Sequence, residues 1–219
     1  AHTRARLCRF LGELPGESLV RTRHVPSLLL FAASMLPALA AAQSGGPNAF
    51  GYEFTPATYD FVAAPSSETP LVMFDDAVVA VSLPWAFPWY GVDRTTAWVG
   101  DNGGVAFFNT PVSYLNSCLP STASAPDIAV FWDDLNVDMG GEIYAWHDTV
   151  GGADRYVISW EDISLFSGTF NNGSFQLHLH PTGEVQLHWE DTSFSSLIFD
   201  DAADATIGIQ DAGVDPLEF

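Results

Sequence analysis

Short runs of β-branched and aromatic residues recur along most of the chain, separated by Gly, Pro, Asn, Asp and Ser. This spacing is typical of strands joined by turns, and no segment beyond an apolar stretch near the N-terminus keeps a helical period. The sequence therefore predicts a protein made of strands. We expect them at 51–62, 77–83, 95–100, 104–108, 127–132, 142–147, 155–160, 174–180, 184–190 and 205–210.

The alternation of apolar and polar residues is clearest over 175–180 and 185–190. The Pro-Thr-Gly segment 181–183 between them fits a three-residue hairpin loop, which would pair Phe175 with Trp189. A strand pair with one apolar face must bury that face against another layer. We therefore expect an all-β fold, an antiparallel β-sandwich, with a closed barrel as the less favoured alternative.

The apolar stretch 27–39 has the form of a secretory signal. It follows an Arg-rich segment, is too short to span a bilayer, and leads into Ala40-Ala41-Ala42, a small-residue cleavage site. We expect export and a protein that is secreted or at the cell surface, with no membrane span in the sequence. The expected divisions are a signal peptide at 1–42, an N-terminal segment at 43–76 that joins the sandwich, the β-sandwich domain at 77–213, and a truncated C-terminal end at 214–219.

The chain is strongly acidic, with 27 Asp and Glu against 7 basic residues. Five of the seven arginines precede the predicted cleavage point, so the remainder keeps only Arg94 and Arg155 and has a formal charge of about −23. Such a field repels phosphate backbones, which argues against a nucleic-acid partner. Cations should accumulate on this surface, so calcium binding and a saline habitat are both open explanations.

Removal of the leader would also remove Cys8 and leave Cys118 as a single cysteine. We then expect no disulfide within the mature chain. A small buried hydrophobic residue is the simplest role for such a thiol, and a disulfide to another molecule is the alternative.

The segment 83–91, Leu-Pro-Trp-Ala-Phe-Pro-Trp-Tyr-Gly, combines aromatic residues with two prolines. Proline lacks the N–H that a central strand needs, so we expect an edge strand or an irregular connection. Aromatic residues in such a segment usually cap the core. An exposed platform for sugars is the functional alternative, and its candidate ligand-binding residues are Trp85, Trp89 and Tyr90.

An ordered series of blocks begins with this aromatic segment and continues through Ala97–Phe108, Ile128–Asn136, Gly140–Tyr144, Arg155–Trp160, Phe175–Leu177 and Ala205–Gln210. Taken in this order over about 78–213, the blocks resemble the nidogen-like (NIDO-type) extracellular domain and its bacterial secreted relatives. The resemblance implies an extracellular β-rich module of a larger matrix, adhesion or surface protein, with no catalytic activity established for the module. It supplies no ligand residues.

A loop near residue 134 has oxygen-bearing side chains at alternate positions, as in the first half of an EF-hand. The second half fails, because Met139 stands where Gly is needed and Ala145 where the bidentate Glu is needed. A looser calcium site competes with a plain Asx-rich turn. The candidate ligands for Ca²⁺ are Asp133, Asp134, Asn136, Asp138 and Glu142.

Three histidines, His178, His180 and His188, project from one face of the predicted hairpin. Three imidazoles with an open fourth position could hold zinc and support hydrolysis. Diagonal neighbours on a sheet stand about 7–8 Å apart at Cα, so solvated strand-face histidines are the simpler interpretation.

The sequence thus predicts a non-catalytic extracellular binding or adhesion module with an extracellular protein or glycan as its partner. We expect it not to be an enzyme and to have no catalytic residues. The alternatives are a carbohydrate-binding module and, less favoured, a zinc-dependent hydrolase. Calcium is the one cofactor that the sequence suggests.

Overall fold

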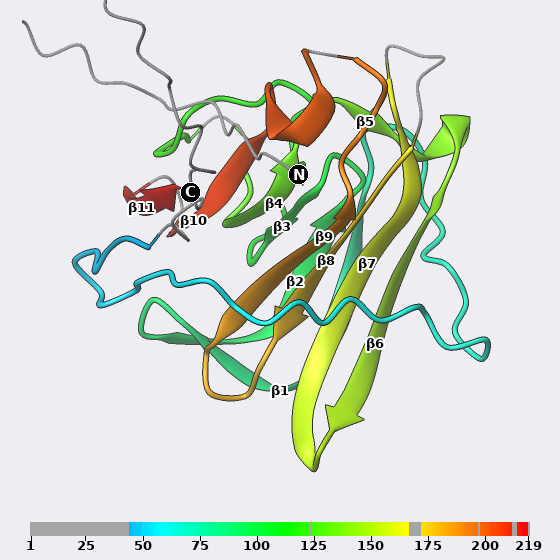
Figure 1. The fold of residues 1–219 in the computed structure, drawn as a ribbon. Helices are drawn as coiled ribbons and strands as arrows, with labels where there is room; N and C mark the ends of the chain where they lie inside the picture. The colour runs from blue at the N-terminus through cyan, green and yellow to red at the C-terminus, as the bar shows by residue number, and fades with distance from the viewer. Residues whose placement is uncertain (1–43, 123, 167–171, 197, 212–213, 219) are drawn as a thin grey trace, which may run out of the picture.

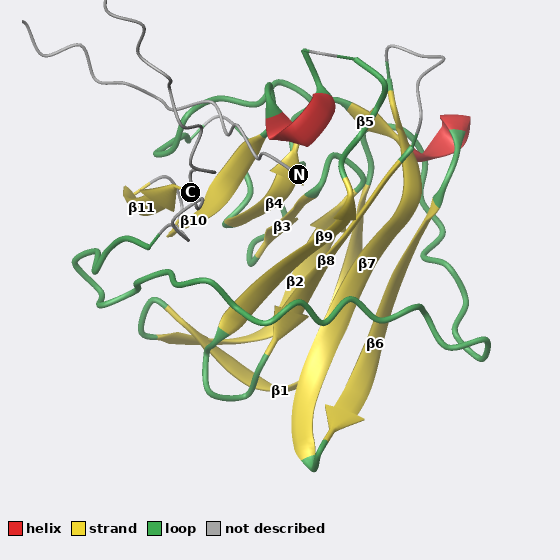
Figure 2. Ribbon diagram, in the orientation of Figure 1, coloured by secondary structure: helices red, strands yellow, loops and turns green. Residues whose placement is uncertain are grey.

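The structure is a computed structural model that describes residues 44–122, 124–166, 172–196, 198–211 and 214–218. Within them the chain forms strands and loops (Figure 1), and helix is limited to two short 3₁₀ turns (Figure 2), η1 (Val137–Met139) and η2 (Asp200–Ala202). In this part of the chain no helix has the length and apolar character needed to cross a bilayer. The predicted signal peptide at 1–42 lies outside the described residues.

One antiparallel sheet has six strands in the order β1-β2-β3-β4-β10-β11. Strand β10 lies between β4 and β11, so residues far apart in sequence form one sheet. The strands are β1 (Val78–Trp89), β2 (Val92–Gly100), β3 (Gly104–Ala106), β4 (Ile128–Trp132), β10 (Thr206–Asp211) and β11 (Val214–Glu218).

The other antiparallel sheet has five strands in the order β5-β7-β8-β9, and β6 also pairs with the long strand β7. Its β8–β9 hairpin has the predicted register, with Phe175 opposite Trp189. The strands are β5 (Leu135–Asn136), β6 (Glu142–Val150), β7 (Ala153–Leu165), β8 (Gly173–Leu179) and β9 (Val185–Asp191).

The two sheets enclose a core rich in aromatic side chains. Phe175 stacks on Phe131 and on Trp160 with ring centroids 5.3 and 5.2 Å apart, and all three are fully buried. Two indole N–H groups also cross between the sheets at 3.0 Å, one from Trp160 to the Gly100 carbonyl and one from Trp189 to the Val130 carbonyl. The predicted antiparallel β-sandwich is confirmed.

Strand β1 shows why the two prolines are tolerated. It is an edge strand, and its pairing with β2 shifts between Ser82 and Phe87, next to Pro84. An edge strand with an irregular register leaves positions at which no ladder N–H is required. The expectation for the aromatic segment 83–91 is therefore confirmed.

Nine of the ten expected strands have a counterpart, but segment 51–62 is extended chain with only an isolated bridge at Phe54. Tyr52 and Phe54 bond to the backbone of residues 45–48, and Asp60 and Val62 bond to side chains on a sheet face, so no strand ladder with the sheet forms there. At the other end Val214–Glu218 pairs with β10 as β11, just beyond the expected end of the sandwich at 213.

Cys118 also differs from its expectation. The residue is exposed, so the expected buried role is wrong. The expectation of no disulfide within the mature chain stays a prediction.

Candidate functional site

A long N-terminal segment crosses the outer face of the five-stranded sheet, in front of β6–β9 (Figure 1). We call its central part, residues 57–66, the strap. From residue 44 to residue 77 no residue is fully buried, and the side chains of this segment that pack against the core, Tyr52, Leu71 and Met73, lie outside the strap. The strap is held instead by polar side chains of the sheet.

The Gln176 side chain on β8 binds both the N–H and the carbonyl group of one strap residue, Val62. Its Oε1 accepts the Val62 N–H at 3.0 Å, while its Nε2 donates to the Val62 carbonyl and to Ser159 Oγ. Two residues further along the strap, the Ala64 N–H donates to Glu161 Oε1 at 3.2 Å. The sheet face therefore recognises an extended backbone through side-chain groups at alternate strap positions.

Arg155 on β7 is the charged centre of this face. Its guanidinium donates to Asp60 Oδ2 at 2.5 Å and to Asp148 Oδ2 at 2.7 Å, and only 4% of its side chain is exposed. A buried cation with two carboxylate partners is compensated in charge. Arg155 thus joins the strap to β6 and β7.

Two buried histidines complete the face. The rings of His178 and His188 lie 4.5 Å apart, and His188 Nδ1 accepts the Asp60 N–H at 3.4 Å. Burial, together with the neighbouring His188 and Arg155, lowers the pKa of His178 to about 3. Burial also lowers the pKa of His188, so both rings are neutral at pH 7.

The zinc hypothesis required three exposed histidines. The strap covers His178 and His188, and His180 is half-buried. The described residues contain no group of three or more His, Cys, Asp or Glu arranged to hold a metal ion. The expected solvent-facing histidine site is therefore wrong. The strap covers this face, and the hydrophobic pattern of the sequence did not predict that position for it.

An aromatic groove of about 630 Å³ lies beside the strap, along β9. The N-terminal segment provides one wall, and the β8–β9 hairpin with part of the six-stranded sheet provides the other. Glu53, Glu184 and Gln186 add polar groups to the lining. The apolar lining includes Tyr52, Phe54, Tyr59, Leu187, Trp189 and Leu217.

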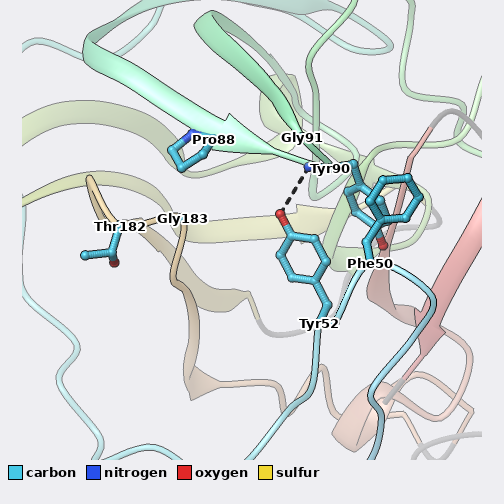
Figure 3. Close-up of a pocket in the computed structure, with 8 residues that line it drawn as sticks. Phe50, Tyr52, Pro88, Tyr90, Gly91, Thr182 and Gly183 are labelled. Atoms are coloured by element: carbon cyan, nitrogen blue, oxygen red, sulfur yellow. Dashed lines mark hydrogen bonds between the residues drawn. The ribbon is translucent and has the colours of Figure 1, made fainter.

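A smaller pocket of about 230 Å³ adjoins the groove and shares Tyr52 and Gly183 with it (Figure 3). The Tyr90 N–H donates to the Tyr52 hydroxyl at 3.2 Å, and the Tyr90 ring lies 5.1 Å from Phe50. These contacts fix the N-terminal segment against the end of β1.

Of the three candidate platform residues, Trp89 is fully buried, Tyr90 is 4% exposed and Trp85 is half-buried. Trp89 contacts Tyr52 and Phe107 with centroids 5.4 and 5.1 Å apart. The expectation of an exposed platform is wrong, because these rings cap the core. Tyr90 also lines the smaller pocket.

Five carboxylates gather at a separate place, which we call the acidic end. The Asp75 N–H donates to Asp138 Oδ2 at 3.2 Å, and the Asp76 N–H donates to Asp101 Oδ2 at 3.1 Å. The two arginines of the described residues are engaged elsewhere, at Asp211 and on the strap face. The acidic end consists of Asp75, Asp76, Asp101, Asp134 and Asp138.

Gly103 holds the turn that carries Asp101 against β4. Its φ is +72°, and a Cβ there would lie 2.0 Å from the Phe131 carbonyl oxygen, so a larger residue does not fit. The Gly103 carbonyl accepts the N–H groups of Val130 and Phe131, each at 3.0 Å. This close approach buries Asp101 completely.

Burial and like charge raise the carboxyl pKa values of the acidic end. Burial, with Asp75 and Asp76 nearby, raises the pKa of Asp101 to about 7. Burial, with the same two neighbours, raises the pKa of Asp134 to about 6. Oδ1 of Asp101 and Oδ1 of Asp75 are buried without a hydrogen-bond partner among the described residues.

The five predicted calcium ligands separate in the structure. Asp134 and Asp138 belong to the acidic end, but Asn136 Oδ1 accepts the Met139 N–H as the cap of η1. Glu142 accepts the Tyr144 hydroxyl, and Asp133, with its pKa raised to about 6 mainly by burial, faces Asp204. The described residues hold no ready metal-binding group, so this ligand set is not supported.

Sequence reasoning did not find the strap contacts of Asp60, Arg155 and Gln176. One signal was available, because Arg155 is one of two arginines after the leader and lies in a strand between Ala153 and Leu165. An arginine placed in a strand of so acidic a chain is expected to have carboxylate partners. The pattern did not reveal that one of them lies 95 positions away.

The fold, with its covered outer face and its groove, defines a β-sandwich module with a built-on N-terminal segment. Residues 51–218 match the family described as NIDO related, and the chain belongs to this family. The nidogen-like family is extracellular. The match starts before β1 and includes the strap, whereas the sequence blocks suggested a start near 78. Searches of curated proteins and of solved structures gave no match.

Proposed function

We propose that the protein is a non-catalytic extracellular binding module of a larger secreted or surface protein, exported by the predicted leader, and that the aromatic groove is its binding site. The observation that carries the proposal is the groove itself, about 630 Å³ between the N-terminal segment and β9. Sites that bind ligands are concave, mostly apolar and supplied with a few polar groups. Membership of an extracellular family supports the same function.

The lining favours an extracellular protein or glycan as partner. Tyr59 is 58% exposed, and Trp189 is half-buried in the groove wall. Exposed Tyr and Trp supply large contact areas and polar atoms, and they dominate many binding interfaces. Carbohydrate binding is the alternative function. Its candidate ligand-binding residues are now these groove aromatics and not the buried Trp89.

The contacts of His188, the histidine that lines the groove, favour a non-catalytic role. Nδ1 of His188 already accepts the Asp60 N–H at 3.4 Å, and burial lowers the pKa of the ring. A general base near neutral pH needs a titrating group free to reach its substrate. His188 instead helps to position the strap.

The test is a binding screen of the full chain against a panel of extracellular matrix proteins and a glycan array. For each ligand found, Tyr59→Ala should weaken binding about tenfold or more, since exposed aromatic anchors carry much of an interface energy. Tyr114→Ala is the matched control, because Tyr114 is 46% exposed and does not line the groove. A protein ligand supports adhesion, and a glycan ligand supports the alternative.

Equal affinities of the wild type and Tyr59→Ala for every ligand would place the binding surface elsewhere and contradict the proposed groove. Loss of binding in Tyr114→Ala but not in Tyr59→Ala would do the same. Thermal unfolding of both variants provides the check that each remains folded.

A further inference from the structure

The outer face of β7–β9 holds an extended chain in the way that a peptide-binding site does. Its side chains bind the backbone of Val62 and Ala64 and the carboxylate of Asp60, which are alternate positions of one extended segment. The bonds to the backbone of Val62 and Ala64 give affinity without reading their side chains. The Asp60 carboxylate, bound by Arg155, is the side chain that this face selects.

The strap is attached so that it can leave. No strap side chain is fully buried, so most of the attachment consists of hydrogen bonds and one ion pair. Segments with few buried apolar contacts lie at the low-stability end of a fold. Departure would expose Gln176, His178 and Arg155, which water can solvate, and would leave the aromatic core between the sheets intact.

We propose that this face binds the strap of a second copy of the chain, so that two modules join by exchanging the N-terminal segment up to residue 66, strap included. Every copy of the chain carries the sequence that fits the face, and exchange restores in trans the contacts seen in cis. Exchange of an identical element is a low-cost route to dimers. The inference goes beyond the proposed binding function, because its recognition contacts are those of the Arg155 face. Tyr59 of the strap also lines the aromatic groove, so exchange would carry this groove residue to the second copy.

Charge complementarity favours this occupant. Arg155 is one of two arginines after the predicted leader, and the face offers it to a carboxylate from the strap. The acidic surfaces of two copies repel each other. Exchange should therefore be observed at about 0.3 M salt, where screening limits the range of this repulsion to a few ångströms.

The test mixes two charge variants of the full chain. Asp60→Arg sets the strap of the first variant against its own Arg155. Arg155→Gln leaves Asp60 of the second variant facing Asp148 with no cation between them.

In a mixture, the unchanged Asp60 strap of the second variant fits the unchanged Arg155 face of the first. The arginine introduced into the strap of the first variant meets Asp148 on the face of the second, which has lost its own cation. Both straps therefore regain a charge partner only by exchange.

Light scattering should show monomers for each variant alone and a dimer of both in the mixture. Asp93→Asn, which changes an exposed carboxylate outside the face, is the control and should behave as wild type. Monomers only, from two folded variants, overturn the exchange.

A synthetic peptide of residues 57–66 provides a second measurement that does not depend on Arg155→Gln folding. It should bind the Asp60→Arg chain at least about tenfold more tightly than the wild type, whose own strap occupies the face. The same peptide carrying Asp60→Arg should lose that binding. Equal, weak binding to both chains overturns the proposal. Peptide binding without dimers overturns a second copy as the occupant.

Discussion

The strap face and the acidic end both bury ionisable groups, but they handle charge in opposite ways. On the strap face the Arg155 side chain is 4% exposed and has carboxylate partners in Asp60 and Asp148. At the acidic end Asp101 is fully buried, has Asp75 and Asp76 as neighbours, and has no basic partner among the described residues. A buried charge needs either a partner of opposite sign or a proton.

The consequence is an opposite response to pH. On the strap face the pKa of His178 falls to about 3, so the folded state favours the neutral ring. At the acidic end the pKa of Asp101 rises to about 7, so the folded state favours the protonated acid. Acid therefore destabilises the first region, and base destabilises the second.

The largest expected effect concerns His178. Its folded pKa lies below the unfolded value of about 6.5, so its contribution is fully present above that pH and is lost as the pH falls towards 3. Between pH 7 and about 4.5 the wild type should lose about 2–3 kcal/mol more than His178→Gln, measured by urea unfolding. The groups that act on this ring are Arg155, Asp60, His180 and His188.

His147→Gln is the matched control, since His147 is exposed at the edge of the same sheet and pairs with Asp154. It should keep the acid sensitivity of the wild type. An equal loss of stability in wild type and His178→Gln would mean that the strap face does not bury a neutral histidine.

The next effect is that Asp101→Asn should stabilise the protein above neutral pH. The folded pKa of Asp101 exceeds its unfolded value, so its contribution is complete below the unfolded pKa and is lost as the pH rises through about 7. Asn resembles the protonated acid and can still accept the Asp76 N–H. The gain should be about 1–3 kcal/mol at pH 8 and should disappear at pH 4, measured by urea unfolding.

Asp93→Asn removes one exposed carboxylate and controls for the change in net charge. If this variant gains as much as Asp101→Asn at pH 8, the effect comes from overall charge and not from burial. A destabilised Asp101→Asn at pH 8 would show that the carboxylate has a favourable partner there.

The sequence predicted what depends on local pattern. Alternation over 175–190 gave the hairpin register, and the prolines of segment 83–91 gave an edge strand, because a strand's period and a missing N–H act within a few residues. The ordered blocks also gave the family, which the match over 51–218 confirms.

The candidate sites could not be predicted in the same way, because they depend on contacts between distant segments. The polar face of β8 was expected to be exposed to solvent, but Asp60 and Val62 lie across it. Val62 is 114 positions from its partner Gln176 in the sequence. Likewise, Asp75 and Asp101 reach the loop near Asp134 only through the pairing of β1, β2, β3 and β4 in the six-stranded sheet. Alternation tells which side chains share a face, but not what covers that face.

The smallest expected effect is that salt should stabilise the acidic end more than the strap face. Sodium chloride screens repulsion among carboxylates, and the predicted mature chain has a formal charge of about −23. Raising its concentration at pH 8 should increase the thermal midpoint of the wild type by a few degrees. The increase should be smaller in Asp101→Asn, because the Asp101 carboxyl, with a pKa of about 7, is charged at this pH and the amide is not. Calcium chloride at the same ionic strength separates screening from the calcium hypothesis. An additional rise that Asp134→Asn abolishes would support a bound ion, because a ligand of the folded state must raise its stability. Equal midpoints in the two salts would contradict a bound calcium ion. Repulsion among the carboxylates, relieved by protons and diffuse cations, would then explain the behaviour of the acidic end.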